Sequence, residues 1–172
     1  MNTLRRIIAV IDLFSPESRV GAIAIATARQ HAAELHFVAL FDHIIPWQAG
    51  DQPPPGSPQE RFVLIETQLR ERLRHYAAHS GSPDASCTII TGPPGEELCQ
   101  MAHEWHADLI LADRQTSRTL RNSWVPWLSP ITSFPCKIEI IAEERHPRLL
   151  HMLDFMRMIK KKKGSGELPP GF

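Results

Sequence analysis

Short apolar runs alternate with segments of helical periodicity along the first 142 residues. Such runs, rich in β-branched residues and bounded by charged or turn-forming residues, are typical of strands in a parallel sheet. The five predicted strands cover residues 6–12, 35–41, 86–91, 109–112 and 137–142. Because helical patterns separate these runs, the chain predicts a doubly wound α/β domain with a five-stranded parallel sheet and right-handed crossovers.

Apolar residues at spacings of three and four predict the helices between these strands. The first helix is expected over residues 16–33, with Ser15 as its N-cap and Pro16 at its first position. The second is expected over residues 59–79. The third follows a Gly-Pro-Pro-Gly turn, opens with two glutamates that suit the helix dipole, and continues to about residue 106.

The domain predicted from this alternation occupies residues 1–144 and includes a proline-rich loop at residues 46–58. Residues 145–163 then predict a basic amphipathic helix, and the glycines and prolines of residues 164–172 predict a flexible tail.

The wide apolar face of the C-terminal helix includes Leu153, Phe155 and Met156. Three interpretations stay open for this face. The helix packs on the domain or across a dimer, it binds a protein partner, or it lies on an anionic membrane surface.

The segment after the fourth strand bears most directly on function. In a parallel sheet, ligands bind beyond the carboxyl ends of the strands, and a phosphate-binding loop there usually carries glycine, because its N–H groups must approach the anion closely. Here the expected loop opens Asp113-Arg114-Gln115-Thr116, and no glycine occurs between Gly95 and Gly164. The sequence thus predicts a nucleotide-type platform without its phosphate-binding glycines.

Composition narrows the function classes. Residues 1–144 hold 12 basic and 17 acidic residues, a net charge of −5, which disfavours nucleic acid as a ligand of this domain. Three cysteines without a Cys-x-x-Cys pair indicate a reducing compartment. We expect neither a signal peptide nor a membrane span, since the apolar runs are too short, and therefore a cytoplasmic protein.

Three small groups of residues are candidates for chemistry. Cys99, His103 and His106 are spaced as on one face of a helix, so they are either zinc ligands awaiting a fourth or half-exposed helix residues. Asp12 either contacts a ligand, caps the first helix or faces Arg114. Asp113 with Arg114 is interpreted as a self-satisfied pair that closes an empty pocket.

Four motifs now carry a family resemblance. They are Arg6-Ile7-Ile8-Ala9-Val10-Ile11-Asp12, Gly92-Pro93-Pro94-Gly95-Glu96-Glu97-Leu98, Ala107-Asp108-Leu109-Ile110-Leu111 and Pro135-Cys136. In this order and spacing, residues 4–142 resemble the universal stress protein family. The resemblance implies a Rossmann-like sheet between helices, an aspartate beside adenosine at Asp12, and a homodimer that forms through the last strand.

The same resemblance shows where the chain departs from ATP-binding members. These carry Gly-x-x-Gly, nine residues, and then Gly-Ser or Gly-Thr, which correspond here to Asp113, Thr116, Pro126 and Trp127. The aspartate adds negative charge where phosphates would lie, the proline lacks an N–H, and the indole replaces a hydroxyl. The fold and the dimer are therefore carried over, but ATP binding is not.

The leading hypothesis is a non-catalytic universal-stress-protein-like domain that dimerises and works through protein contacts in stress response, signalling or regulation. Its nucleotide site is degenerate, no cofactor or metal is expected, and no Walker A or nucleophile–base motif predicts an enzyme. The expected dimer or partner contacts are Ile138, Ile140, Leu153, Phe155 and Met156.

Two alternatives are kept. In the first, the domain binds ATP or AMP through Asp12, Leu13, Asp113, Arg114 and Thr116. In the second, the protein is a peripheral membrane or transporter-associated adaptor that acts through its C-terminal helix.

Overall fold

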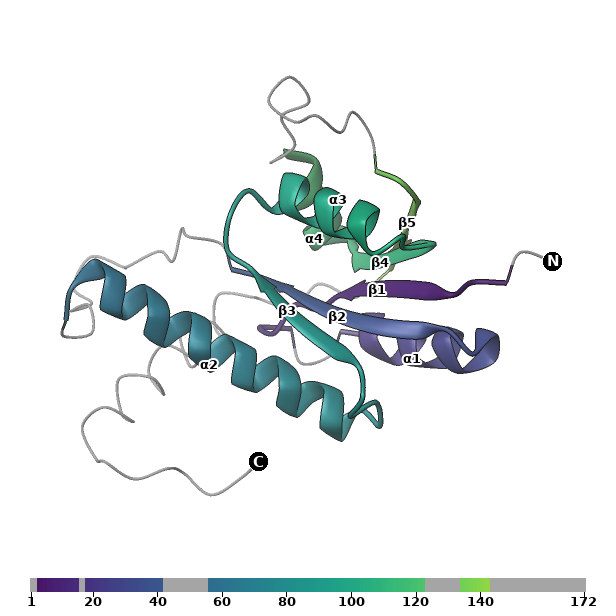
Figure 1. Ribbon diagram of the computed structural model, residues 1–172, viewed down its shortest axis with the longest axis horizontal. Coiled ribbons are helices and arrows are strands. Elements are labelled where there is room, and N and C mark those ends of the chain that lie inside the picture. The colour runs from purple at the N-terminus through teal and green to yellow at the C-terminus, as the bar shows by residue number, and fades with distance from the viewer. Residues whose placement is uncertain (1–2, 16–17, 42–55, 123–133, 143–172) are drawn as a thin grey trace.

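The computed structural model describes residues 3–15, 18–41, 56–122 and 134–142. The strands of this part of the chain are β1 (Arg6–Val10), β2 (Glu34–Leu40), β3 (Ser86–Ile90), β4 (Leu109–Asp113) and β5 (Lys137–Ile141). The helices are α1 (Val20–His31), α2 (Pro58–His79), α3 (Pro94–Glu104) and α4 (Arg114–Asn122). Strands and helices alternate as the hydrophobic pattern predicts (Figure 1).

All five strands are parallel and follow the order β3-β2-β1-β4-β5. The central strand, β1, pairs on both sides, so that Ile8 lies between His36 of β2 and Ile110 of β4. The chain first extends the sheet from β1 towards β3 and then returns to add β4 on the other side. The order therefore reverses between β1 and β4, which is where ligands usually bind in open α/β sheets.

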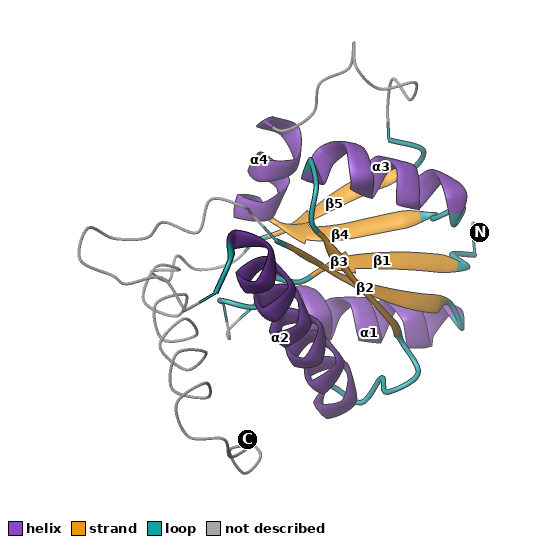
Figure 2. Cartoon of the chain, turned by 60° about the vertical axis from the view of Figure 1, so that its left-hand side comes forward, coloured by secondary structure: helices purple, strands orange, loops and turns teal. Residues whose placement is uncertain are grey.

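Alternation along the strands gives the sheet two apolar faces. On one face Ile7, Phe37 and Leu111 pack with residues of α1 and α2. On the other, Ile8 and Ile110 pack with residues of α3 and α4. Figure 2 shows the resulting three layers. The predicted doubly wound α/β fold is confirmed.

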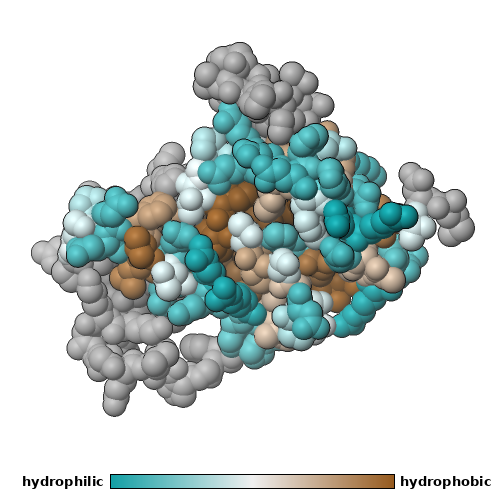
Figure 3. Space-filling view, in the orientation of Figure 1, coloured by the Kyte–Doolittle hydropathy of each residue, from teal (hydrophilic) through white to brown (hydrophobic). Residues whose placement is uncertain are grey.

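The two edges of the sheet differ in their surroundings. Within the described residues, β3 pairs only with β2, and β5 pairs only with β4. Figure 3 shows apolar atoms at the surface over the β3 side of the sheet, between α2 and α3, with hydrophilic atoms around them. At the opposite edge, Lys137 and Glu139 of β5 are exposed.

The start of α1 differs from the prediction. The helix begins at Val20, with Arg19 at its N-cap and no side-chain cap, instead of at Pro16 after Ser15. The reason is a turn after β1, in which the N–H of Ser15 donates to the carbonyl of Asp12 at 3.1 Å. Ser15 lies five residues before Val20 and Arg19 occupies the N-cap position, so the serine does not cap the helix.

The three longer helices end in the same way. The residue after each helix, or one further on, has a positive φ, and the next N–H returns to a carbonyl five residues earlier, as in a Schellman motif. The positive-φ residues are Ala32 (53°), Gly81 (81°) and His106 (53°). The returning bonds run from Ala33 to Ala28, from Ser82 to Ala77 and from Ala107 to Ala102.

Several predicted segments lie outside the described residues. They are the proline-rich loop up to residue 55, the C-terminal helix predicted over residues 145–163, and the tail over 164–172. Within the described residues, no helix combines the length and apolar character that crossing a bilayer requires.

Candidate functional site

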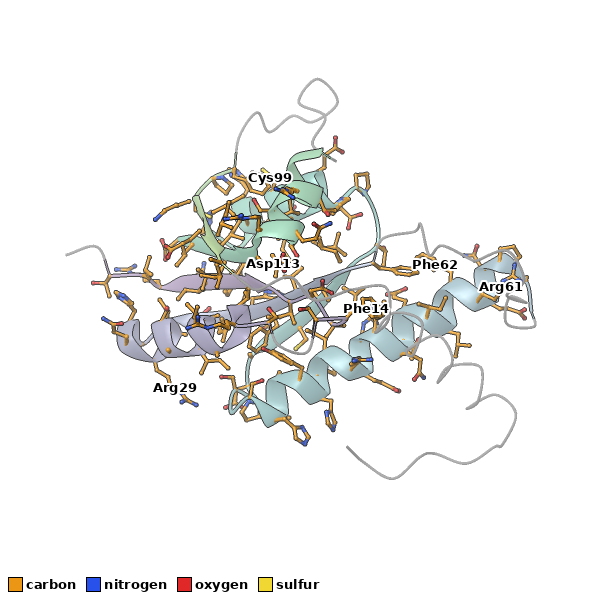
Figure 4. The ribbon with its side chains drawn as sticks, turned by 180° about the vertical axis from the view of Figure 1, so that it is seen from behind. Phe14, Arg29, Arg61, Phe62, Cys99 and Asp113 are labelled. Carbon is orange, nitrogen blue, oxygen red and sulfur yellow. The ribbon has the colours of Figure 1, made fainter. Side chains whose placement is uncertain are left out.

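The candidate site lies at the carboxyl ends of β1 and β4, where the strand order reverses. Asp12 follows β1, and Asp113 is the last residue of β4. Since the two strands pair in parallel, both aspartates lie at one end of the sheet. Figure 4 shows Asp113 and Phe14 near this end.

A small cavity occupies this position. Its volume is about 20 Å³, which is room for about one water molecule. Among the described residues its lining includes Asp12, Leu13, Phe14, Pro94, Thr116 and Thr119. The loop after β1, the end of β2, the start of α3 and one side of α4 thus converge on it.

Asp12 organises the turn after β1. Its carboxylate accepts a hydrogen bond from the N–H of Phe14 at 3.0 Å, an Asx turn that directs the chain out of the sheet. The first helix begins eight residues later, at Val20, so the hypothesis that Asp12 caps this helix is wrong.

Asp113 caps a helix that was expected to be a loop. α4 begins at Arg114, directly after β4, so Asp113 is its N-cap and Thr116 is the third helical residue. The Asp113 carboxylate accepts one hydrogen bond from the Thr116 N–H at 2.6 Å and another from the Thr116 hydroxyl at 2.8 Å. The expectation of a glycine-free loop at residues 113–116 is therefore wrong, because a side-chain cap and a helix take its place.

The same bonds correct the expected Asp113–Arg114 pair. Asp113 is 4% exposed and Thr116 is 5% exposed, whereas Arg114 lies at the surface. Ion pairs among the described residues include Arg6–Glu34, Arg70–Glu66 and Lys137–Glu139, and neither Asp113 nor Arg114 takes part in these. Asp113 is thus satisfied by its own helix and not by the neighbouring guanidinium.

The structure brings together part of the residue set predicted for a nucleotide. Asp12, Leu13 and Thr116 line the cavity, while Asp113 and Arg114 are not among its lining residues. Sequence reasoning missed Thr119, which also lines it. The signal was the spacing of three between Thr116 and Thr119, which places both on one side of a helix but has no meaning in a loop.

The predicted contact strand lies at the sheet edge. Ile138 of β5 is half-buried against the α3–α4 face, while Ile140 is 42% exposed. Lys137 and Glu139 point to the other face of the sheet, and their side chains pair at 3.3 Å. Leu153, Phe155 and Met156, also predicted as contacts, lie outside the described residues.

Cys99, His103 and His106 do not share a helix face. Cys99 is fully buried in α3, and burial raises the pKa of its thiol. His106 lies beyond the end of α3 in a left-handed conformation and is exposed. Within the described ranges, no group of three or more His, Cys, Asp or Glu side chains is arranged to hold a metal ion.

A sequence model described as the Universal stress protein family matches residues 3–123. No curated protein matches the chain significantly.

Solved structures give the same fold. A Pseudomonas aeruginosa UCBPP-PA14 protein described as a universal stress protein is 15% identical, with a TM-score of 0.51, over 91% of this chain and 52% of that one. A functionally unknown protein of P. aeruginosa PAO1 is also 15% identical, with a TM-score of 0.51, over 92% and 53%. The chain thus spans about half the length of these two proteins. A universal stress family protein of Arabidopsis thaliana with AMP bound is 13% identical, with a TM-score of 0.46, over 81% and 92%.

Proposed function

The chain belongs to the universal stress protein family, and we propose that it is a non-catalytic member that acts by forming a homodimer and contacting other proteins. Its role would lie in stress response or regulation in the cytoplasm, without binding ATP in the way usual for the family. The observation that carries this proposal is the hydrogen bonding of Asp113 to Thr116.

The N-terminus of a helix is a natural anion site, because its first N–H groups lack partners and its dipole favours negative charge. At α4 the chain supplies its own anion, since the Asp113 carboxylate accepts both the N–H and the hydroxyl of Thr116. A phosphate brought within about 4 Å of that carboxylate meets a like charge, which costs about 4 kcal/mol at an effective dielectric of 20. This supports a site without a triphosphate.

The size of the cavity supports the same proposal. About 20 Å³ holds roughly one water molecule, whereas pockets for small ligands usually enclose about 300–1,000 Å³. A nucleotide at this place would require Phe14, Pro94 or Thr119 to move away from the cavity.

The exposed edge of β5 supports the dimer. An edge strand presents unpaired N–H and C=O groups, and β5 pairs only with β4 in the described sheet. Ile140 and Val63 are the two exposed large hydrophobic residues of the described part of the chain. Of these, Ile140 lies on the edge strand, where a second copy would cover it.

Titration calorimetry with ATP, ADP and AMP tests the nucleotide part. We expect no binding of any of the three to the full-length protein at micromolar concentrations. Asp113→Asn keeps an acceptor for the cap but removes its charge, so comparison with wild type shows how much the charge contributes. Micromolar affinity of the wild-type protein for any of these nucleotides would contradict the proposal.

Sedimentation equilibrium at several concentrations tests the dimer. We expect a dimer that Ile140→Lys weakens at least tenfold, because the charge must be desolvated in the interface. Val63→Lys is the matched control, since it places the same charge at a similarly exposed apolar position on α2. A wild-type monomer at every concentration would rule the dimer out.

The second candidate function is an adenine-nucleotide module with an altered phosphate site. It is favoured by one observation, the convergence of Asp12, Leu13 and Thr116 on a single cavity at the reversal point of the sheet. In that case AMP would bind at micromolar concentrations, and Asp12→Ala would weaken it at least tenfold. Calorimetry with AMP distinguishes the two functions directly.

A further inference from the structure

A pair of histidines on α2 has a geometry that none of the functions above uses. His75 and His79 lie one helical turn apart near the end of this 22-residue helix, and both are exposed. Their rings stack with centroids 3.8 Å apart and planes 22° from parallel. The helix beneath them is held in place by buried Leu73 and Ala77, so the two side chains project from a rigid support.

The hydrogen bonding of His79 leaves one of its ring nitrogens available. Its Nδ1 lies 2.9 Å from the carbonyl oxygen of His75. Because a carbonyl only accepts, Nδ1 carries the proton in a neutral ring, and Nε2 then has a free lone pair. A ring N–H bonded to a backbone carbonyl is also the usual outer-shell arrangement of metal-ligating histidines, since it fixes both tautomer and ring orientation.

The separation of the two rings suits a single metal ion. Two imidazole nitrogens that each ligate zinc at 2.0–2.1 Å lie at most about 4.2 Å apart. In the structure the rings are stacked with their centroids 3.8 Å apart, so their in-plane lone pairs do not yet meet at one point. The terminal torsion of histidine is broad enough for the His75 ring to turn towards the Nε2 of His79, while the Nδ1 hydrogen bond holds the His79 ring.

We propose that His75 and His79 form a two-imidazole site for a divalent transition metal ion of the zinc and nickel type. Imidazole suits these ions, whereas magnesium and calcium prefer oxygen ligands. The remaining coordination positions are open to water, because no third ligand completes the site within the described residues. The affinity is therefore lower than that of four-ligand structural zinc sites.

Calorimetric titration of the full-length protein with zinc chloride tests the proposal. We expect a site with one zinc per chain whose affinity falls at least tenfold in His75→Ala and equally in His79→Ala. The double variant should lose no more than either single variant, since one imidazole alone cannot chelate. Magnesium chloride should give no heat from this site. Acidic buffer should weaken zinc binding, because a metal-bound imidazole must be unprotonated.

His103→Ala is the matched control, because it removes an exposed histidine from a different helix, α3. It should leave the zinc affinity of the site unchanged. His75→Gln repeats the test with a residue of good helix propensity, and far-ultraviolet circular dichroism checks that the helix is retained. The proposal is overturned if both single variants bind zinc within twofold of wild type, or if His103→Ala reduces binding as much as they do.

Discussion

The carboxylate of Asp113 holds Thr116 by two hydrogen bonds, one from its N–H and one from its hydroxyl, at the junction of β4 and α4. Both residues are almost fully buried. This pair explains why a helix follows the strand with no intervening loop, and it places a fixed negative charge beside the cavity.

Asp113→Ala should destabilise the fold by about 2 kcal/mol, because it removes an N-cap and leaves the buried hydroxyl and N–H of Thr116 without an acceptor. Urea unfolding measures the change. Ser57→Ala, which removes the exposed cap of α2, should cost less, about 1 kcal/mol. Equal losses in both variants would show that burial adds nothing to the Asp113 cap.

Leu73→Ala should reduce the free energy of unfolding by about 2–5 kcal/mol, because Leu73 is fully buried between α2 and the sheet and its loss leaves a cavity. Val63→Ala on the same helix is the control. Val63 is 53% exposed, so its truncation should change stability by less than about 0.5 kcal/mol. Chemical denaturation of the two variants side by side makes the comparison.

Glycine at His106 should stabilise the protein by about 0.5–1 kcal/mol. His106 has a φ of 53°, a left-handed conformation that costs L-residues about 1–2 kcal/mol, offset in part by the entropy of glycine in the unfolded chain. Gly81→Ala, at the equivalent end of α2, should destabilise by a similar amount. Thermal unfolding of both variants tests the prediction, which fails if the two shifts have the same sign.

Gly21→Ala should destabilise by about 1–3 kcal/mol, because a Cβ at this position on α1 overlaps the ring and hydroxyl of Tyr76 on α2. Tyr76→Phe removes the atom of closest approach. In the Tyr76→Phe background, the cost of Gly21→Ala should therefore be smaller. A double-mutant cycle measures this coupling, and strict additivity would show that the two residues are not in contact.

The thiol of Cys136 should react slowly with iodoacetamide at pH 8. Burial, followed by the nearby charges of Asp108 and Cys99, raises the pKa of Cys136 from its ordinary value of 9.0 to about 11. The folded state therefore holds the proton more tightly, and the stability this gives is present below pH 9 and lost as the pH rises through 11. Peptide mass spectrometry gives the alkylation rate against pH, with a midpoint near 11 when folded. In urea the midpoint should return to about 9.

Local patterns were sufficient to predict the strands. The central strands are short apolar runs that suit a sheet buried on both faces, and β5 alternates charged and apolar residues as an edge strand does. α4 was missed for the opposite reason. Among its residues 114–120, only Leu120 is both apolar and buried, and the helix depends on a cap and on the small buried side chains of Thr116 and Ser117. The absence of glycine in this segment predicts a loop without phosphate donors only where no helix forms, and that same absence favours a helix.

Two further predictions, the start of α1 and a shared face for Cys99, His103 and His106, are wrong because local spacing does not show where a helix begins or ends. Ser15-Pro16 is a good helix start in isolation, but the chain turns after Asp12 and the helix begins only at Val20. The spacing of Cys99, His103 and His106 predicted a shared face, yet α3 ends before His106. In both cases the sequence contains a sound local signal that a hydrogen bond or a helix end overrides.

The position of β1 between β2 and β4 has a consequence for synthesis in the cell. Pairing of β1 with β2 needs only the first 40 residues. The N–H groups of Arg5 and Arg6, however, donate to the carboxylate of Asp108, which is synthesised more than 100 residues later. At translation rates of about 5–20 residues per second, the innermost strand emerges from the ribosome roughly 5–20 s before its second neighbour. During that interval one flank of the nascent sheet is open to chaperones or to wrong partners.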